Sequence, residues 1–402
     1  MRSFLIVFLF CSITVQSQTT ASMGKKAVTS VKKHVEFLSS DRLEGRRTGT
    51  NGEKLAYTYI SKQFKKAGLL PYANKGSYIQ PFTVNEKENR KGHNVIGYIN
   101  NYAVYTIVLG AHYDHLGYGE DKNSMYRDSI PMIHNGADDN ASGTAALISM
   151  AKSLKKLGNK KYNYLFIAFS GEELGLFGSK YFTEHPTVPL SSINYMVNMD
   201  MVGRLNAESL SITVGGYGTS PVWGQLIKTT DPSLSIKIDS SGTGPSDHSS
   251  FYRKDIPVLF FFTGTHTDYH KPSDDADKIN YNGIVQISEY IKNLIASTAD
   301  MGKIAFTKTR EVSTGRMSFK VSLGIMPDYT FAGPGVMVEG ISAGRPAEKA
   351  GILTGDVILQ LGENKTSTVE DYMKALGKFD KGQTINAIII RANKEMTVAV
   401  NF

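Results

Sequence analysis

Cysteine is nearly absent from this sequence: Cys11 is the only one among 402 residues. It lies in an apolar stretch near the N-terminus that has the pattern of a cleavable leader. The chain after that leader therefore has no thiol with which to form a disulfide. Its stability must come from side-chain packing and from any metal that it binds.

Long apolar runs and long basic blocks are lacking too. No apolar run reaches the roughly 20 residues needed to cross a bilayer, so we expect no transmembrane segment. The 45 Lys and Arg residues outnumber the 37 Asp and Glu residues, for a formal net charge of +8, but they stand in pairs such as Lys65-Lys66. Nucleic-acid binding is typical of longer basic blocks, so we predict none.

A secretory signal peptide is predicted for residues 1–17. Arg2 gives a short basic start, Phe4–Phe10 is an unbroken apolar run, and the small residue Ser17 precedes the expected cleavage site. We therefore expect the protein to be exported, to a periplasm or to the extracellular space.

The distribution of apolar residues predicts an α/β fold. Helical spacing is found in residues 55–68, 147–154 and 284–294, the last behind an expected cap at Asn282. Strands alternating with these helices indicate a mixed, mainly parallel sheet sandwiched by helices. Five apolar runs have the composition of strands covered on both faces: Val95–Ile99, Tyr105–Leu109, Tyr164–Phe169, Tyr195–Met199 and Pro257–Phe262.

The composition changes after about residue 300. Residues 306–317 are polar and lack a clear period, so we predict a linker there, between an α/β domain at 18–305 and a second domain at 318–402. The second domain has short strand-like segments separated by glycine-rich turns. We expect it to be a small β-rich module.

Acidic residues and histidines follow the predicted strands at five places. Ligands bind at the carboxyl ends of the strands in parallel sheets, so these residues are the first candidates for a functional site. The five segments are Ala111–His115, Gly136–Gly143, Ser170–Gly175, Asp200–Arg204 and His266–Asp274.

So many acids at one edge of a sheet would repel one another and resist desolvation unless cations lay among them. Metal ions are the simplest such cations. Imidazole and carboxylate without thiol suit zinc, manganese or cobalt better than magnesium or calcium. Two metals would allow one carboxylate to bridge them, with a polarised water between them as the nucleophile.

In this order, the five segments resemble the co-catalytic di-zinc aminopeptidases of the twenty-eighth metallopeptidase family, whose relatives include glutamate carboxypeptidase and glutaminyl cyclase. The resemblance runs from about Leu38 to about Ala299 and includes the first segment of the family pattern, Leu38–Arg46. It implies a zinc-exopeptidase-like fold and peptidase chemistry.

The resemblance also implies that five residues hold two Zn²⁺ ions. His112 and Asp200 would hold one zinc, Glu173 and His270 would hold the other, and Asp138 would bridge the two.

Further roles follow from the same resemblance. Glu172 would be the general base that deprotonates the water and passes the proton to the leaving amine. Tyr269 would support the oxyanion of the tetrahedral intermediate, and Asp114 would orient the first ligand of the set. The peptide after the bridging aspartate is commonly cis in the family, which here is the bond Asp138-Asp139.

The resemblance leaves other polar residues without a role. The loop Ser246–Phe251 resembles one that borders the substrate pocket, and no function is assigned to it. Four histidines are expected not to be ligands, because the five residues above complete the set: His115, His134, His185 and His266.

The C-terminal segment resembles a PDZ domain of the bacterial protease-associated type. Ser322-Leu323-Gly324-Ile325 looks like the carboxylate-binding loop, and Pro346–Ile358 is the most diagnostic run. Such domains bind an extended chain end as an added strand, so a peptide or protein C-terminus is the implied partner. A module that only packs on the catalytic domain or mediates assembly is the alternative.

Together these features predict a secreted zinc-dependent aminopeptidase that acts on peptides through a metal-bridging hydroxide. The exopeptidase assignment comes from the resemblance, because no residue that binds the free amine is identified. A carboxypeptidase-type or glutaminyl-cyclase-type relative therefore stays open. The alternative of another class is an inactive scaffold that binds peptides through its PDZ domain, and the intact ligand set argues against it.

Overall fold

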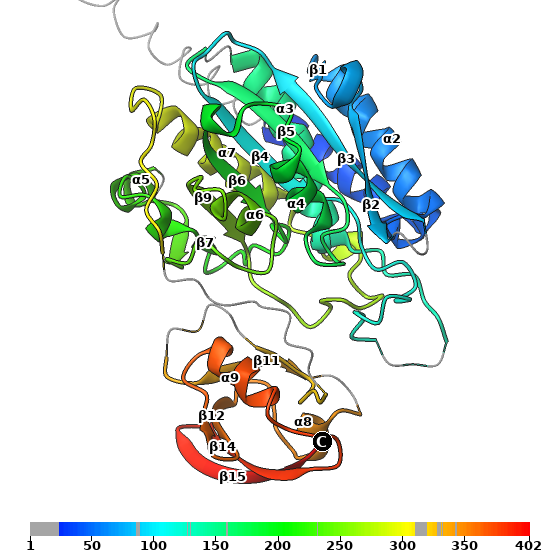
Figure 1. Ribbon diagram of the computed structural model, residues 1–402, viewed down its shortest axis with the longest axis vertical. Coiled ribbons are helices and arrows are strands. Elements are labelled where there is room, and N and C mark those ends of the chain that lie inside the picture. Colours follow the sequence, from blue (N-terminus) through cyan, green and yellow to red (C-terminus); the bar gives the residue numbers. More distant parts are fainter. Residues whose placement is uncertain are drawn as a thin grey trace, which may run out of the picture.

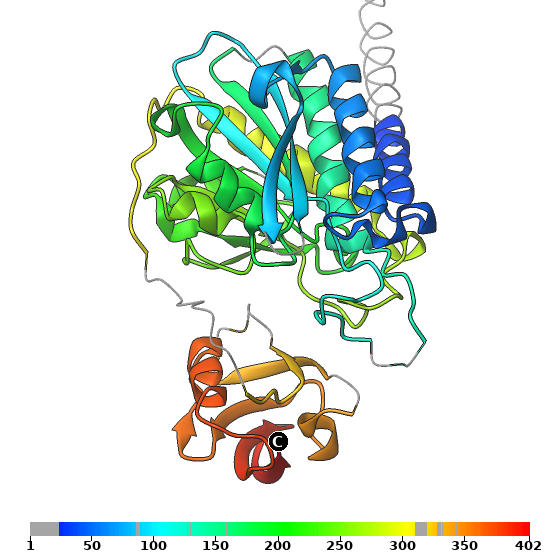
Figure 2. The same ribbon diagram turned by 45° about the vertical axis from the view of Figure 1, so that its right-hand side comes forward.

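The chain builds two sheets, each with its own hydrophobic core, in the computed structural model (Figures 1 and 2). The described residues are 24–402 without 86–88, 127, 129, 158–159, 231, 310–319, 328–330, 332 and 342–343. The predicted signal peptide lies outside them. None of the helices in this part of the chain combines the length and the apolar composition that a bilayer crossing requires.

The larger sheet is mixed, with a parallel centre. Its strand order is β1-β3-β5-β4-β6-β9-β7-β8, with β2 paired to β3, and β5, β4, β6 and β9 run parallel to one another. The predicted α/β fold is confirmed. The strands are β1 (Leu70–Pro71), β2 (Ile79–Asn85), β3 (Arg90–Ile99), β4 (Thr106–His112), β5 (Asn163–Phe169), β6 (Ile193–Met199), β7 (Ser211–Gly215), β8 (Ser235–Ile238) and β9 (Val258–Phe262).

Helices cover both faces of this sheet, which is why its central strands are apolar on both sides. Every residue of β4, β5 and β6 is buried. One face packs against α2, α3 and α7, and the other against α4 and α6. Residues 24–38 are also helical. The helices are α2 (Asn51–Lys66), α3 (Gly143–Leu157), α4 (Phe177–Glu184), α5 (Trp223–Thr229), α6 (His248–Tyr252) and α7 (Tyr281–Ser297).

Short helical turns connect these elements. Most of them are single 3₁₀ turns of three residues, whereas the two longer ones carry residues of the functional site. They are η1 (Asp41–Arg46), η2 (Asn74–Gly76), η3 (Ala137–Ser142), η4 (Leu190–Ser192), η5 (Tyr217–Thr219) and η6 (Ala276–Lys278).

The start of α7 differs from the prediction. Asn280, and not Asn282, is the cap: its side chain accepts a hydrogen bond from the backbone N–H of Gly283. Both asparagines precede the apolar stripe that begins at Ile284. The spacing of apolar residues therefore locates the helix but leaves its first turn uncertain by one or two residues.

The smaller sheet is antiparallel, as expected for the β-rich module. It has the order β10-β11-β12-β14-β15, with β13 paired to β12. Its core includes Leu323, Ile358 and Tyr372. The elements are β10 (Ile325–Pro327), β11 (Val336–Ile341), α8 (Pro346–Lys349), β12 (Val357–Leu361), β13 (Asn364–Lys365), α9 (Val369–Leu376), β14 (Thr384–Arg391) and β15 (Lys394–Asn401).

The first residues of the segment between the two sheets pack against the larger domain. Phe306 packs against its core, and the Thr309 backbone N–H donates to the Tyr252 hydroxyl. Residues 310–319 are outside the described part of the chain. The linker at 306–317 stays a prediction.

Candidate metal centre

The candidate centre lies where the parallel strands end. The last residue of β4 is His112, and Asp200 directly follows β6. These strands are neighbours, paired in parallel with Gly110 beside Asn198. Two residues further along both strands, His112 and Asp200 are therefore brought side by side by the register of the sheet itself.

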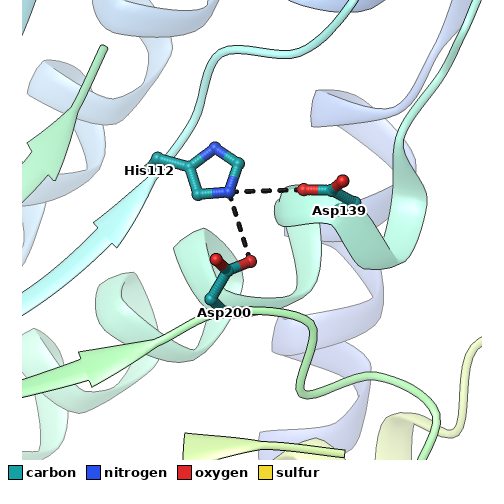
Figure 3. Close-up of side chains that lie close together, drawn as sticks. All are labelled: His112, Asp139 and Asp200. Carbon is teal, nitrogen blue, oxygen red and sulfur yellow. Dashed lines mark hydrogen bonds and ion pairs between the residues drawn. The ribbon is translucent and has the colours of Figure 1, made fainter. Parts of the chain in front are cut away.

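Three side chains form a first group of metal-binding donors: His112, Asp139 and Asp200 (Figure 3). The Nε2 atom of His112 lies 3.2 Å from Oδ1 of Asp200 and 3.3 Å from Oδ1 of Asp139. All three side chains are buried. One nitrogen and two carboxylate oxygens thus converge on one point.

A second group lies on the other side of Asp139. The Nε2 atom of His270 is 3.2 Å from Oδ2 of Asp139 and 3.3 Å from Oε2 of Glu173. Asp139 therefore directs one carboxylate oxygen to each group. This is the arrangement that a carboxylate shared by two cations requires.

The donor separations fit a tetrahedral metal. Bonds of about 2.0–2.1 Å at tetrahedral angles put neighbouring ligand atoms about 3.3 Å apart. The four distances at His112 and His270 are 3.2 or 3.3 Å. The residues present therefore fit zinc, and each group has three protein donors.

The prediction that Asp138 is the bridging carboxylate is wrong. Its Oδ2 lies 3.2 Å from Nε2 of His266, and its Oδ1 accepts a hydrogen bond from the Gly203 N–H. Asp139 takes the central place, and the cis peptide bond is Asp139-Asn140, one residue later than expected. The backbone leaves helical geometry at Asp139 and Asn140, so the two neighbouring aspartates point in different directions and only Asp139 faces the centre.

His115, which we expected not to be a ligand, contacts the second group. Its Nδ1 lies 2.8 Å from Oε1 of Glu173 and 3.8 Å from Oδ2 of Asp139, so these three residues could also hold a metal ion. The ring of His115 is edge-on to that of His270. Glu173 thus has an imidazole beside each of its oxygens.

The other three histidines expected to be non-ligands lie outside both groups. His134 bonds to the Ser124 hydroxyl, and His185 stacks on Tyr181. His266 pairs with Asp138, as described above.

A loop carbonyl holds the second histidine. His270 Nδ1 lies 2.8 Å from the carbonyl oxygen of Asn123, which fits an N–H donating to it, and the Asn123 amide donates to the backbone oxygen of Glu173. A ligating imidazole typically uses its other nitrogen in this way. The sequence gives no signal for Asn123, because the contact uses a main-chain oxygen of an irregular loop.

Two residues support the first group. Asp114 lies beside His112, with its backbone oxygen 3.2 Å and its Oδ1 3.7 Å from the imidazole Nδ1. This position fits the orienting role expected of it. Ser246, in the loop to which no role was assigned, donates its hydroxyl to Oδ2 of Asp200 and accepts from the Asn198 amide.

Glu172 lies next to the first group without belonging to it. Its backbone N–H donates to Oδ1 of Asp114. Burial raises the pKa of its carboxyl well above the usual value; the positive charge on His112 opposes this shift, whereas Glu173, Asp200 and Asp247 add to it. A carboxyl with a raised pKa can take up a proton and release it again near neutral pH.

The site also has an excess of negative charge. Burial alone would lower the pKa of His112, yet the carboxylates of Asp200 and Glu172 raise it well above the usual value. At His270, the carboxylates of Glu173 and Asp139 likewise outweigh burial and raise the pKa. The surroundings thus favour cations strongly, and metal ions would meet the same demand.

Tyr269 lies against the second group. Its ring stacks on that of His270, with 3.9 Å between the ring centroids. The tyrosine is therefore close to the donors, and its proposed contact with an oxyanion stays a prediction.

A salt-bridged loop covers this side of the centre. Asp121, two residues before Asn123, is held by the guanidinium groups of Arg47 and Arg90, with N–O distances of 2.8–2.9 Å. Partial burial opposes ionisation, but the two arginines outweigh it and hold the pKa of Asp121 well below its usual range. The salt bridges of Asp121 with Arg47 and Arg90 thus hold in place the loop whose Asn123 carbonyl accepts from His270.

Two family models match the chain. Residues 94–295, half of it, match Peptidase family M28, and residues 301–402 match a PDZ domain. Aminopeptidase YwaD of Bacillus subtilis is 28% identical over 272 residues, which are 59% of each chain. Leupeptin-inactivating enzyme 1 of Streptomyces exfoliatus is 33% identical over 168 residues. That match covers 40% of this chain and 37% of the enzyme, so the chain spans less than two thirds of either relative.

Solved structures share the fold of the larger domain. An aminopeptidase from Aneurinibacillus has a TM-score of 0.53 at 16% identity, with 70% of this chain and 95% of that chain covered. Glutaminyl cyclase from Porphyromonas gingivalis has a TM-score of 0.54 at 17% identity, with 67% and 98% covered. At sequence identities of 16% and 17%, the similarity shows a shared fold.

The Asp121 anchor predicts a pH-dependent contribution to stability. Asp121→Asn should lower the free energy of unfolding by about 1–3 kcal/mol at pH 7, because bonds to charged groups are lost. A depressed folded-state pKa gives its full stabilisation above the unfolded value of about 3.9, and this gain decreases progressively as the pH falls from there through the folded-state pKa. Urea unfolding at pH 7 and pH 3 should therefore show a smaller difference between variant and wild type at pH 3. Asp300→Asn, at the exposed Lys161 pair, is the control and should change little; an equal loss at both pH values for Asp121→Asn would contradict the prediction.

Proposed function

Because this chain belongs to Peptidase family M28, we propose that it is an exported zinc-dependent aminopeptidase that removes N-terminal residues from peptides. The observation that carries the proposal is the position of Asp139, whose two carboxylate oxygens face two separate sets of donors. The aminopeptidases among its relatives support the reaction class. Export is proposed from the sequence of residues 1–17.

His112 and Asp200 would hold one zinc, His270 and Glu173 the other, and Asp139 both. When bound, such a pair of zinc ions acts as a Lewis acid and lowers the pKa of water toward neutrality. Two ions per chain are proposed from the two donor groups.

Glu172 would be the general base and then the general acid. It adjoins the first donor group and has a raised pKa, so its carboxylate can take a proton from the attacking water and give it to the leaving amine. Asp114 fixes the backbone of Glu172 through the hydrogen bond to its N–H. Tyr269 would donate its hydroxyl to the oxygen of the scissile carbonyl as negative charge develops there.

The larger domain also shares its fold with a glutaminyl cyclase, so the test includes cyclisation and, as a third reaction, the release of C-terminal residues. A panel of aminoacyl, N-blocked and N-terminal glutaminyl peptides, assayed with and without chelator, tests the three reactions. We expect chelator-sensitive release of free N-terminal residues. Turnover only of N-blocked peptides from their C-terminal ends, or only cyclisation, would overturn the aminopeptidase proposal.

We propose that the PDZ domain captures an acidic peptide C-terminus. A groove of about 980 Å³ lies between β10, α8 and α9. Of the predicted loop, Ser322 and Ile325 line this groove, whereas Leu323 is buried in the core. Four basic residues and no acidic one are among the described residues that line it, namely Lys320, Arg345, Lys349 and Lys381.

The bridging role of Asp139 predicts opposite outcomes for two neighbouring substitutions. Asp139→Asn should weaken zinc binding by more than about 100-fold, since even outer-shell changes typically cost about 10–100-fold. Asp138→Asn is the matched control and should cost less than about tenfold. Competition with a chelator measures both affinities. Loss of zinc in the Asp138 variant alone would restore Asp138 as the bridge.

Glu172→Gln should keep the zinc affinity of the wild type and lower kcat by about 10²–10⁴-fold, because a proton acceptor is lost while the donors stay in place. Elemental analysis and steady-state kinetics provide the two measurements. Glu184→Gln, at the exposed end of α4, should leave both unchanged. Wild-type turnover in the Glu172 variant would remove that residue from the mechanism.

The basic lining of the PDZ groove predicts charge-dependent binding. Lys349→Glu should weaken the binding of an acidic C-terminal peptide by about 1.5- to 5-fold, measured by fluorescence anisotropy, which is the range expected for exposed charge pairs. Lys394→Glu, outside the groove in β15, is the control. Amidating the peptide C-terminus should also weaken binding. Equal affinity for acidic and basic peptides would contradict the charge argument, and equal affinity for the amide would contradict capture of the carboxylate.

A further inference from the structure

Arg46 is a fully buried arginine beneath the candidate centre. It ends η1, in the first segment of the family pattern, and no role was predicted for it. Its guanidinium donates to four backbone carbonyls, and among the described residues no hydrogen bond or ion pair joins it to a carboxylate. The acceptors are the oxygens of Tyr113 (2.7 Å from Nε), Leu38 (2.5 Å from Nη1), Asn135 (2.6 Å from Nη1) and Gly136 (3.0 Å from Nη2).

Three of these four carbonyls, all except that of Leu38, belong to the segments that deliver two metal donors. Tyr113 directly follows His112, and Gly136 lies three residues before Asp139. The guanidinium is planar, and its donors have a fixed geometry. One rigid group thus ties the end of β4 to the turn that carries Asp139.

Arg46 also brings a positive charge under a group of acids. Burial lowers its pKa to about 10, whereas Asp139, Asp114, Asp274 and Glu173 act in the opposite direction. The side chain therefore stays protonated at neutral pH. Its charge offsets the repulsion among carboxylates that must stay ionised to bind metal.

We propose that Arg46 is a positioning residue that tunes zinc affinity by fixing the spacing of His112 and Asp139. This inference rests on the proposed zinc centre. A residue that only supports the fold would stabilise the metal-free and zinc-loaded proteins equally. A positioning residue stabilises the zinc-loaded protein more, because its loss raises the Kd for zinc and reduces the stabilisation that zinc provides.

The experiment compares wild type, Arg46→Lys and Arg46→Gln as full-length proteins after removal of the leader. Lysine keeps the charge but loses the planar fork, and glutamine loses both. Arg391→Lys is the matched control, since Arg391 forks onto Asp356 in the smaller domain. Zinc affinity is measured by competition with a chelator, and Tm is measured with and without zinc.

We expect the zinc Kd to rise about 10–100-fold in both Arg46 variants, with a smaller zinc-induced rise in Tm than in wild type. Arg391→Lys should leave the zinc Kd unchanged. A folded Arg46 variant with the wild-type Kd would overturn the inference. So would failure of both variants to fold with zinc present, or folding only when zinc is present, because Arg46 would then serve the metal-free fold itself. A wild-type protein that binds no zinc would instead refute the proposed function.

Discussion

The structure depends on the close approach of several carboxylates at one edge of a parallel sheet. Asp139 and Asp200 are buried, and Glu173 is largely buried, within a few ångströms of two imidazoles, and their field is strong enough to raise the pKa of both rings despite burial. Such a cluster is stable only if positive charge lies among its members. The helices on both faces and the three fully buried strands β4, β5 and β6 supply the packing that holds the acids together against their repulsion.

Much of this could be predicted from the sequence, because strand ends can be recognised. The apolar runs that became β4, β5 and β6 end one to three residues before a polar residue, and parallel strands bring their carboxyl ends to the same edge. His112 and Asp200 follow from that rule. Glu173 and His270 were reached through the family pattern; the structure places their side chains beside each other, and their role as ligands stays a prediction.

The remainder depends on details that a residue pattern does not contain. Asp138 and Asp139 are chemically identical neighbours, and only the path of the backbone through η3 decides which one faces the centre. Asn123 acts through its carbonyl oxygen, which every residue has. His115 was set aside because five ligands completed the expected set, although its ring lies beside Glu173.

The two halves of the centre differ in how they are built. The pair His112 and Asp200 is spaced by the hydrogen-bond register of β4 and β6, so its separation is as fixed as the sheet. His270 instead stands in a loop and leans on another loop through Asn123. One half is thus positioned by backbone hydrogen bonds within the sheet and the other by contacts between loops, so a change in the Asn123 loop would move His270 and leave the spacing of His112 and Asp200 as it is.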